Sequence, residues 1–322
     1  MRGRNWLVPL LLLLGGCAPR EKESQEVLRQ ALQVPHYRGE LSPQLLQTWK
    51  HRDLIFEQLR FHGRDNQWVA ALACYSELAR FRPLPALLCI PGSSNRKEEL
   101  LQPLDLLPRW ADQGFFVLSI DRSQDEEILL RQKGLPGLWG HQVYNLMRAV
   151  DYLQNRPEVA GGRIGMLGLS MGGMEALWLA ALDQRIGVVV SASGHLVWAE
   201  IFATDSWKLI FGDLPLGREL LASGVSGARA REAFNTAYPQ LAELDAVLVA
   251  PGLAPRPLLL VTGDLDPYIT PGATRRVYEA AESAYADSGR ASCLEMWVEP
   301  QVGHGFSAAM QERALDWFRR WL

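Results

Sequence analysis

A serine in a glycine-rich turn is the first residue whose surroundings could support chemistry. Gly168, Ser170 and Gly172 form the pattern Gly-x-Ser-x-Gly. The pattern lies between an apolar, strand-like run at 164–167 and a predicted helix at 174–182. A turn this tight leaves no room for side chains at the two glycines, and it exposes the serine hydroxyl at its tip. The pattern therefore predicts a nucleophilic serine, although a glycine-rich turn with an idle serine has the same spacing.

The chain also supplies a base and an acid for this serine, in the order Ser170, Asp266, His304. A serine hydroxyl needs a base within hydrogen-bond reach and an acid that orients the base. His304 is the candidate base, because it follows the last predicted strand and has glycines on both sides that let the loop bring the imidazole inward. Asp264 and Asp266 compete as the acid. Asp264 can simply cap its turn, so Asp266, which lies one step further out, is preferred.

Two backbone amides are needed to hold the oxyanion that a serine attack produces. The amide of Met171 is expected to be the first, because it directly follows the serine in the turn that leads into the predicted helix and its positive end. The second is expected from the loop after the apolar run at 86–90, with Ser93 as first choice and Ser94 behind it. An ordinary turn has the same composition as this loop. His195, which follows the strand after the serine, could line the same pocket.

The first 16 residues have the three-part layout of a secretion signal. The start is positively charged, the apolar run at 6–14 is too short to span a bilayer, and two glycines precede Cys17. Leu14-Gly15-Gly16-Cys17 resembles a bacterial lipobox, in which the cysteine is lipidated and becomes the new N-terminus. This resemblance implies a lipoprotein of the cell envelope. Ala18, where an aspartate would favour the inner membrane, points to the outer membrane and the periplasm.

Behind the signal, residues 17–42 are expected to form a polar tether and residues 43–322 one α/β domain. The domain is expected to begin with a short helix at 43–51 and an antiparallel hairpin formed by 54–62 and 68–78. Strand-like runs then alternate with helical patterns, which predicts a mostly parallel sheet with helices on both faces. The further strands are expected at 86–90, 115–120, 164–167, 186–190, 258–262 and 294–298, and the helices at 98–113 (interrupted by prolines), 139–154, 174–182, 274–288 and 308–322.

The segment 195–254, just before the strand that bears the acid, breaks this alternation. An insertion there would lie above the carboxyl ends of the strands, where ligands bind in open α/β folds. Its aromatic residues could form a cap over an acyl or sugar pocket, or could pack against one another in a helical excursion. These residues are Trp198, Phe202, Trp207, Phe211 and Tyr238.

Composition narrows the functional classes. The chain has 322 residues, 48% of them hydrophobic, and a net charge of −3, so it lacks the strongly basic balance that a nucleic-acid partner requires. Cys74, Cys89 and Cys293 lie in apolar runs and are expected to be buried. No paired cysteine or histidine spacing indicates a metal, and no cofactor is expected. The composition leaves the oligomeric state open.

Taken together, the motifs resemble those of the α/β-hydrolase superfamily over residues 54–322. The elbow at 165–173, the segments 156–159 and 254–259, and Gly303-His304-Gly305-Phe306 are similar to the acetyl xylan esterase and dienelactone hydrolase-like branches, including prolyl-oligopeptidase-like esterases. The resemblance implies an α/β-hydrolase fold with a cap-like insertion. The roles it implies are nucleophile for Ser170, base for His304, acid for Asp266, and oxyanion donors for Met171 and Ser93.

The chain departs from these relatives in two places. Pro91-Gly92 stands where many of them have His-Gly, which bears on the second oxyanion donor. Dienelactone hydrolases proper use a cysteine where this chain has Ser170, which argues against their reaction.

The function that follows is a serine hydrolase that cleaves small-molecule or glycan esters through an acyl-enzyme, anchored by a lipid at Cys17. A serine peptidase or an acyltransferase would use the same three residues, because the sequence does not reveal the leaving group. A non-catalytic lipoprotein that keeps the fold for binding is the third possibility. Neither the substrate nor the acyl length can be read from the motifs.

Overall fold

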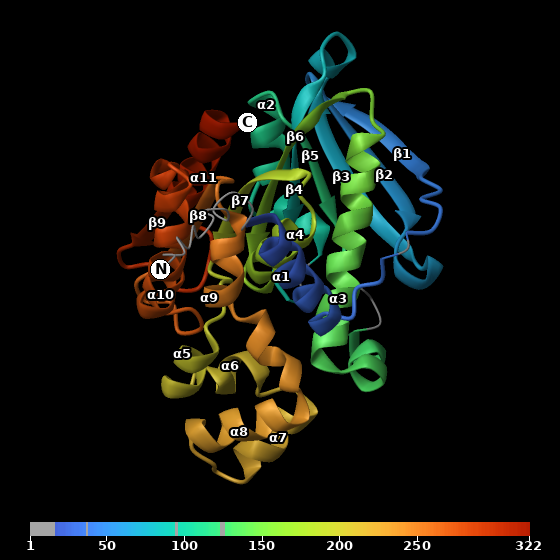
Figure 1. Cartoon of the computed structure of the whole chain (residues 1–322). Helices are drawn as coiled ribbons and strands as arrows, with labels where there is room; N and C mark the ends of the chain where they lie inside the picture. The colour runs from blue at the N-terminus through green and yellow to red at the C-terminus, as the bar shows by residue number, and fades with distance from the viewer. Residues whose placement is uncertain (1–16, 37, 94–95, 123–125) are drawn as a thin grey trace, which may run out of the picture.

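A computed structural model shows one mixed β-sheet with helices on both faces (Figure 1). It describes residues 17–36, 38–93, 96–122 and 126–322. The strands are β1 (Gln44–His51), β2 (Leu54–His62), β3 (Trp68–Ser76), β4 (Leu84–Ile90), β5 (Phe116–Ile120), β6 (Val159–Leu169), β7 (Ile186–Ala192), β8 (Leu258–Gly263) and β9 (Leu294–Glu299). The helices are α1 (Cys17–Ala31), α2 (Leu106–Asp112), α3 (Glu126–Gln154), α4 (Met171–Leu182), α5 (Trp198–Ala203), α6 (Trp207–Phe211), α7 (Pro215–Ala222), α8 (Gly227–Ala237), α9 (Ala246–Val249), α10 (Pro271–Asp287) and α11 (Ala308–Trp321).

The sheet has the predicted architecture. Its strand order is β1-β2-β3-β5-β4-β6-β7-β8-β9. The first three strands form an antiparallel meander that joins β5 antiparallel, and the strands from β5 to β9 are parallel. Strands β4, β7 and β8 are continuous apolar runs, because helices cover both of their faces. The predicted class, a mostly parallel α/β sheet with an N-terminal antiparallel hairpin, is confirmed.

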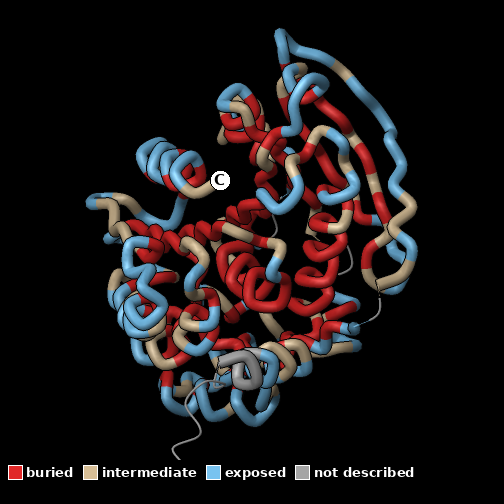
Figure 2. The backbone as a smooth tube through the Cα atoms, turned by 45° about the horizontal axis from the view of Figure 1, so that its top comes forward, coloured by how far each residue is buried: buried red, intermediate tan, exposed pale blue. Residues whose placement is uncertain are grey.

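Two helical layers enclose the sheet. Helices α1, α3, α4 and α10 pack on one face, and α2 and α11 pack on the other. Figure 2 shows the buried residues gathered at the centre of the molecule and the exposed ones at its periphery. The predicted burial of Cys74, Cys89 and Cys293 is confirmed, and none of the three forms a disulfide. In parallel sheets of this kind the loops at the carboxyl ends of the strands meet at one edge, which is where the candidate site forms.

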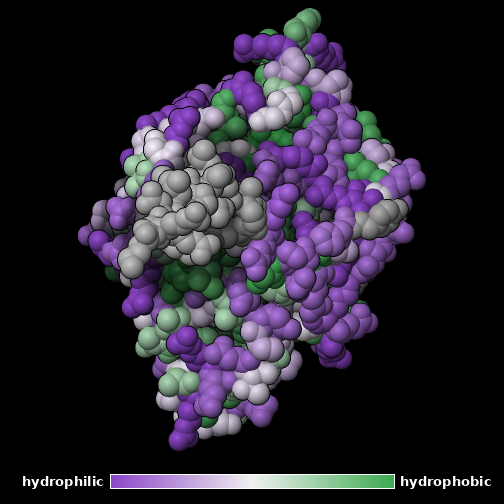
Figure 3. All heavy atoms as spheres, in the orientation of Figure 1, coloured by the Kyte–Doolittle hydropathy of each residue, from purple (hydrophilic) through white to green (hydrophobic). Residues whose placement is uncertain are grey.

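The stretch 43–51, predicted as a short helix, is the edge strand β1. It pairs antiparallel with β2, and Trp49 stacks on Phe56 with ring centroids 5.3 Å apart. The prediction was wrong, because a stretch this short has no clear period and its pairing with β2 decides its conformation. Most of its side chains are exposed, and Figure 3 shows a largely hydrophilic surface on the side of the molecule where β1 and α3 lie.

The predicted tether at 17–42 is also wrong over much of its length. Residues 17–31 form helix α1, and Leu28 and Leu32 are buried against α3 and α4. The backbone of this segment passes very close to the backbone of α3. A side chain on Gly140 of α3 would place its Cβ only 1.6 Å from the carbonyl oxygen of Leu32. The apolar residues of this segment were too few to predict burial, but they fill a groove that α3 and α4 leave open.

Ion pairs fasten the rest of this segment to the domain. The guanidinium of Arg38 donates to Asp151 at 2.7 Å and to Asp183 at 3.5 Å. Cys17, the lipidation candidate, is the first residue of α1, and the predicted signal at 1–16 lies outside the described residues. In the part of the chain that the structure describes, no helix combines the length and the apolar character needed to cross a bilayer.

The insertion at 195–254 contains helices α5 to α9 together with two 3₁₀ turns, and α5 to α8 form a lobe at the lower end of Figure 1. Its core is aromatic. The ring of Phe234 lies 5.6 Å from that of Phe202, 5.3 Å from that of Phe211 and 6.4 Å from that of Trp207. All four side chains are buried. Of the two alternatives for these aromatic residues, packing against one another is the one that the structure supports.

Candidate active site

Ser170 lies at the tip of a sharp turn between β6 and α4. Its backbone has φ 52° and ψ −127°, a conformation that residues other than glycine rarely adopt. The neighbouring glycines are required by space. A Cβ on Gly168 would lie 1.9 Å from the carbonyl oxygen of Gly172, and one on Gly172 would lie 2.7 Å from the carbonyl oxygens of Ile90 and Pro91. The local sequence therefore folds into the strained elbow that the pattern predicts.

Three loops from distant parts of the chain meet at this elbow. The Nε2 atom of His304 lies 2.8 Å from the Oγ atom of Ser170, and its Nδ1 atom lies 2.9 Å from an Oδ atom of Asp266. The three residues follow β6, β8 and β9, whose carboxyl ends lie at the same edge of the parallel sheet. Gly263 allows the last two loops to touch, since a Cβ there would lie 2.1 Å from the carbonyl oxygen of Val302.

Asp266 is held in its ionised form. Its side chain is fully buried, and one carboxylate oxygen accepts hydrogen bonds from the amides of Tyr268 and Ile269 at 2.8 and 3.0 Å. Burial alone would raise the pKa of Asp266, but hydrogen bonds from His304 and the two amides outweigh it and hold the pKa below its ordinary value. The competing Asp264 is exposed, and Asp266 is the aspartate that contacts the imidazole.

This arrangement can transfer a proton between the Ser170 hydroxyl and the His304 imidazole. When Nδ1 of His304 donates its hydrogen to the Asp266 carboxylate, Nε2 presents a lone pair to the hydroxyl of Ser170. The imidazole can then take the hydroxyl proton while the oxygen attacks an electrophile, and the buried carboxylate stabilises the imidazolium that forms. The ring of Tyr268 packs on His304 with centroids 4.5 Å apart, which restricts its rotation. Sequence reasoning did not single out Tyr268.

The two expected oxyanion donors lie on elements that adjoin the serine. Met171 is the first residue of α4, so its amide has no acceptor within the helix and lies at the positive helix end. The loop after β4 passes over Ser170, because a Cβ on Gly92 would lie 3.0 Å from the Cβ of Ser170. Ser93 follows in this loop and is exposed, and Ser94 lies outside the described residues. The roles of Met171 and Ser93 remain predictions.

His195 does not line the site. It is fully buried, with Nδ1 3.3 Å from the hydroxyl of Ser191 and Nε2 2.7 Å from the hydroxyl of Thr274. Burial lowers its pKa to about 4. The chain turns inward at this point, since a Cβ on Gly194 would lie 1.8 Å from the carbonyl oxygen of Ser170. The sequence correctly predicted that His195 follows the strand after the serine, but it contained no signal for the direction of its side chain.

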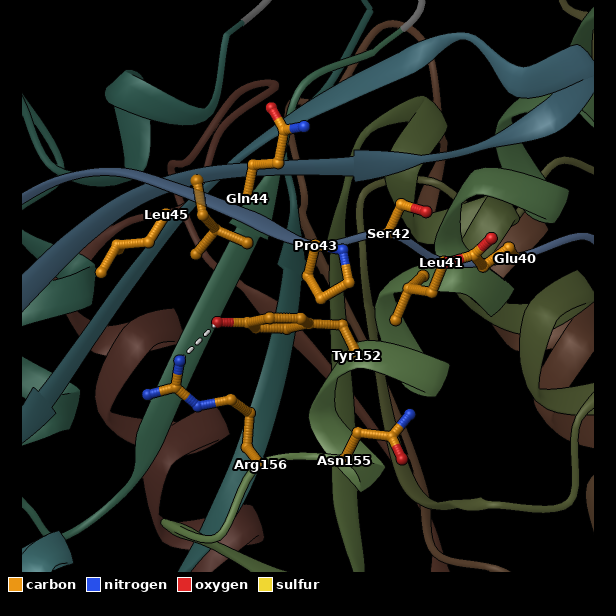
Figure 4. A pocket seen from close by; sticks show the side chains of 10 residues that line it. Glu40, Leu41, Ser42, Pro43, Gln44, Leu45, Tyr152, Asn155 and Arg156 are labelled. Atoms are coloured by element: carbon orange, nitrogen blue, oxygen red, sulfur yellow. Dashed lines mark hydrogen bonds between the residues drawn. The ribbon is translucent and has the colours of Figure 1, made fainter.

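Ser170, Asp266 and His304 lie outside the pocket drawn in Figure 4. Across the described ranges, no three His, Cys, Asp or Glu side chains lie close enough to hold a metal ion. A pocket of about 500 Å³ opens between the start of β1 and the end of α3, where Tyr152 lies across it (Figure 4). Its cation, Arg156, is engaged by Glu57 and Glu158 and donates to the Tyr152 hydroxyl at 2.7 Å.

The strained serine elbow, the hydrogen-bonded histidine and aspartate, and the largely parallel sheet together define a hydrolase of the α/β-hydrolase fold. Comparison with known families makes this more specific. The chain belongs to the prolyl oligopeptidase family, whose sequence model matches residues 108–322.

Individual relatives agree with this class. The "Putative hydrolase YtaP" of Bacillus subtilis is 29% identical over 260 residues, which cover 74% of this chain and 79% of that protein. Dipeptidyl-peptidase 5 of Porphyromonas gingivalis is 24% identical over 257 residues, 74% of this chain but 34% of that protein. Acetyl xylan esterase 1 from Thermoanaerobacterium has a similar structure, with a TM-score of 0.69, 18% identity and 93% of each chain covered.

Proposed function

We propose that the protein is a serine esterase, with Ser170 as nucleophile, His304 as base and Asp266 as acid. The observation that carries the proposal is the unbroken line of contacts of 2.8 and 2.9 Å from the hydroxyl through the imidazole to the buried carboxylate. Membership of a hydrolase family supports the same reading. The alternative of a non-catalytic binding protein would leave the strained backbone at Ser170 without a use.

The reaction proceeds through an acyl-enzyme. The Oγ atom of Ser170 attacks the ester carbonyl carbon as its proton passes to Nε2 of His304. Amides of Met171 and Ser93 hold the oxyanion, and its collapse breaks the bond to the alcohol, which leaves with the proton from His304. Water then enters, gives its proton to His304 and attacks the acyl carbon. The acid departs and the serine recovers its proton.

The substrate is proposed to be a small-molecule or glycan ester. The side chain of His304 is 24% exposed, so the triad is reached directly from solvent. Similar structures carry the names acetyl xylan esterase and glucuronoyl esterase. No nucleic-acid partner is proposed, in keeping with the net charge of −3.

A lipid at Cys17 is proposed to hold the protein at the outer membrane, facing the periplasm. The support is the lipobox-like Leu14-Gly15-Gly16-Cys17. Since α1 starts at Cys17 and docks into the domain by Leu28, a lipid there would hold the domain close to the bilayer. Membrane fractionation of the full chain and of Cys17→Ala tests this, and recovery of both in the same fraction would contradict it.

The esterase assignment is tested by Ser170→Ala with short-chain nitrophenyl esters. We expect a fall in kcat of about 10⁴-fold or more. Ser223→Ala, a serine on the surface of the insertion, should match the unmodified protein. A fluorophosphonate probe should label the unmodified chain and not the Ser170→Ala variant. Equal turnover by both variants would overturn the proposal.

A peptidase is the second candidate, and two findings favour it. The family model is that of the prolyl oligopeptidases, and one relative is a dipeptidyl-peptidase. The same triad would then expel an amine in place of an alcohol. A panel of nitrophenyl esters and of dipeptide and prolyl anilides separates the two, and faster cleavage of the anilides would replace the ester assignment.

A further inference from the structure

A buried ion pair links the end of β5 to the helix that begins at the serine elbow. The guanidinium of Arg122 donates to both carboxylate oxygens of Glu175, at 2.8 and 2.6 Å. The Glu175 side chain is fully buried and that of Arg122 is 8% exposed. Glu175 lies on α4, four residues after Met171. Each terminal nitrogen of the Arg122 guanidinium contacts a different carboxylate oxygen, which is the two-point geometry of an arginine–carboxylate ion pair.

The preceding residue makes a matching contact to the loop on the other side of the serine. The carboxylate of Asp121 accepts the amide of Lys97 at 3.0 Å and its ammonium at 2.7 Å. The Lys97 side chain is only 5% exposed. Lys97 begins a 3₁₀ turn (Lys97–Leu100) that ends the loop after β4, the loop whose Gly92 lies against Ser170.

These two contacts come from consecutive residues and reach the two elements that carry the expected oxyanion donors. β5 is paired with β4, so the end of β5 lies beside the loop after β4, and the side chain of Arg122 reaches across to Glu175 on the helix that follows β6. Asp121 binds Lys97, four residues after Ser93, and Arg122 binds Glu175, four residues after Met171. Oxyanion donors must lie about 2.7–3.1 Å from the oxygen that becomes charged, and an error of about 1 Å costs about 10²-fold in rate.

We propose that Asp121 and Arg122 are positioning residues that together set the spacing of the two oxyanion donors. The proposal rests on the esterase function proposed above. Neither residue belongs to the proposed triad. A carboxylate with two donors from one lysine, and a guanidinium in a two-point contact with a carboxylate, fix direction as well as distance. A single hydrogen bond from either residue would leave its partner free to turn.

The test measures how well the enzyme distinguishes an ester from its thionoester, in which sulfur replaces the carbonyl oxygen. Sulfur is larger and accepts hydrogen bonds poorly, so the rate ratio reports the fit of the oxyanion donors. For Arg122→Lys and Asp121→Asn, we expect kcat for the ester to fall by about 10- to 100-fold with little change in KM. The ester-to-thionoester ratio of kcat/KM should fall by about 10-fold in both variants.

Arg156→Lys is the matched control. Arg156 also makes a two-point contact with a carboxylate, that of Glu57 at 2.9 and 3.2 Å, but it lies at the far end of α3. This variant should lose stability and keep both kcat and the ratio. If Arg122→Lys does not fold, Asp121→Asn carries the test.

The outcomes distinguish a failure of the positioning role from a failure of the proposed esterase function. An unchanged ratio in the folded variants, or an equal fall in Arg156→Lys, overturns the positioning role while the triad stands. Ester turnover that survives in Ser170→Ala overturns the function itself.

Discussion

Different interactions stabilise two neighbouring parts of the molecule: the sheet edge that carries Ser170, Asp266 and His304, and the insertion at 195–254. The edge depends on directional contacts, with each of its three polar groups within 3 Å of the next. The insertion depends on the packing of aromatic rings around the buried Phe234. A hydrogen bond weakens steeply with misalignment, whereas dispersion between apolar groups has no preferred direction. Changes at the edge should therefore affect rate more than stability, and changes in the insertion should do the reverse.

Gly168→Ala is the strongest challenge to this contrast, because we expect it to reduce both the rate of ester turnover and the stability. The new Cβ would lie 1.9 Å from the backbone oxygen of Gly172, and backbone cannot move aside without opening the elbow. We expect a loss of about 4 kcal/mol or more in the free energy of unfolding, with ester turnover abolished. Gly161→Ala in the same strand meets no atom within 4 Å and is the control. Urea unfolding of both variants measures the difference.

Asp266→Asn should separate rate from stability at the edge. The amide cannot stabilise the imidazolium as a carboxylate does, so we expect kcat to fall by about 10³- to 10⁴-fold, or about 4–5.5 kcal/mol. The melting temperature should change little, since the side-chain oxygen of asparagine can still accept hydrogen bonds from the amides of Tyr268 and Ile269. Asp264→Asn, on the exposed neighbour, should leave kcat unchanged. A larger effect at 264 than at 266 would reassign the acid.

Phe234→Ala tests the other half of the contrast. Removing a fully buried ring should cost about 3–5 kcal/mol of stability, because it leaves a cavity among the remaining aromatic residues. At 25 °C the folded fraction should still turn over ester within about 3-fold of the unmodified rate. Phe81→Ala, at a ring that is 86% exposed, is the control. A fall in kcat comparable with that of Asp266→Asn would instead make the insertion part of the substrate site.

The smallest expected effect concerns His195, the first residue of the insertion, which follows β7. Burial lowers its pKa to about 4, against about 6.5 in an unfolded chain. Its contribution to stability is therefore complete above pH 6.5 and is lost as the pH falls toward 4. At pH 5 the loss is about 2 kcal/mol. Urea unfolding at pH 8 and pH 5 should show a shallower acid dependence for His195→Gln than for the exposed His36→Gln. Equal slopes would contradict this.

Several features could be predicted because they depend on local steric needs. The glycines beside Ser170 are required by a turn that has almost no room, and the same crowding fixes the position of the hydroxyl. The order of the serine, aspartate and histidine along a βα alternation was enough to predict that they meet. β2 begins and ends at the predicted residues, Leu54 and His62, because its apolar alternation is clear.

Other elements were missed where distant contacts outweigh local pattern. Helix α3 begins at Glu126, well before the predicted 139, although Gly134, Pro136 and Gly137 look like a break. Gly134 does depart from helical geometry, with φ 68°, and α3 is kinked there, so the predicted helix corresponds to the part after the kink and the part before it was missed. Arg122 and Glu175 carried no readable signal at all, because 53 positions separate them in sequence.

The sequence alone determined the shape of the turn at Ser170 and which strand ends carry the residues that contact it, since sterics and strand order act over short ranges. Only the tertiary structure decided that residues 44–51 form an edge strand, that Leu32, just after α1, lies against Gly140, and that His195 turns inward. Each of these depends on a surface formed by residues far away in the chain. A pattern of neighbours cannot encode a partner that becomes adjacent only when the sheet has formed.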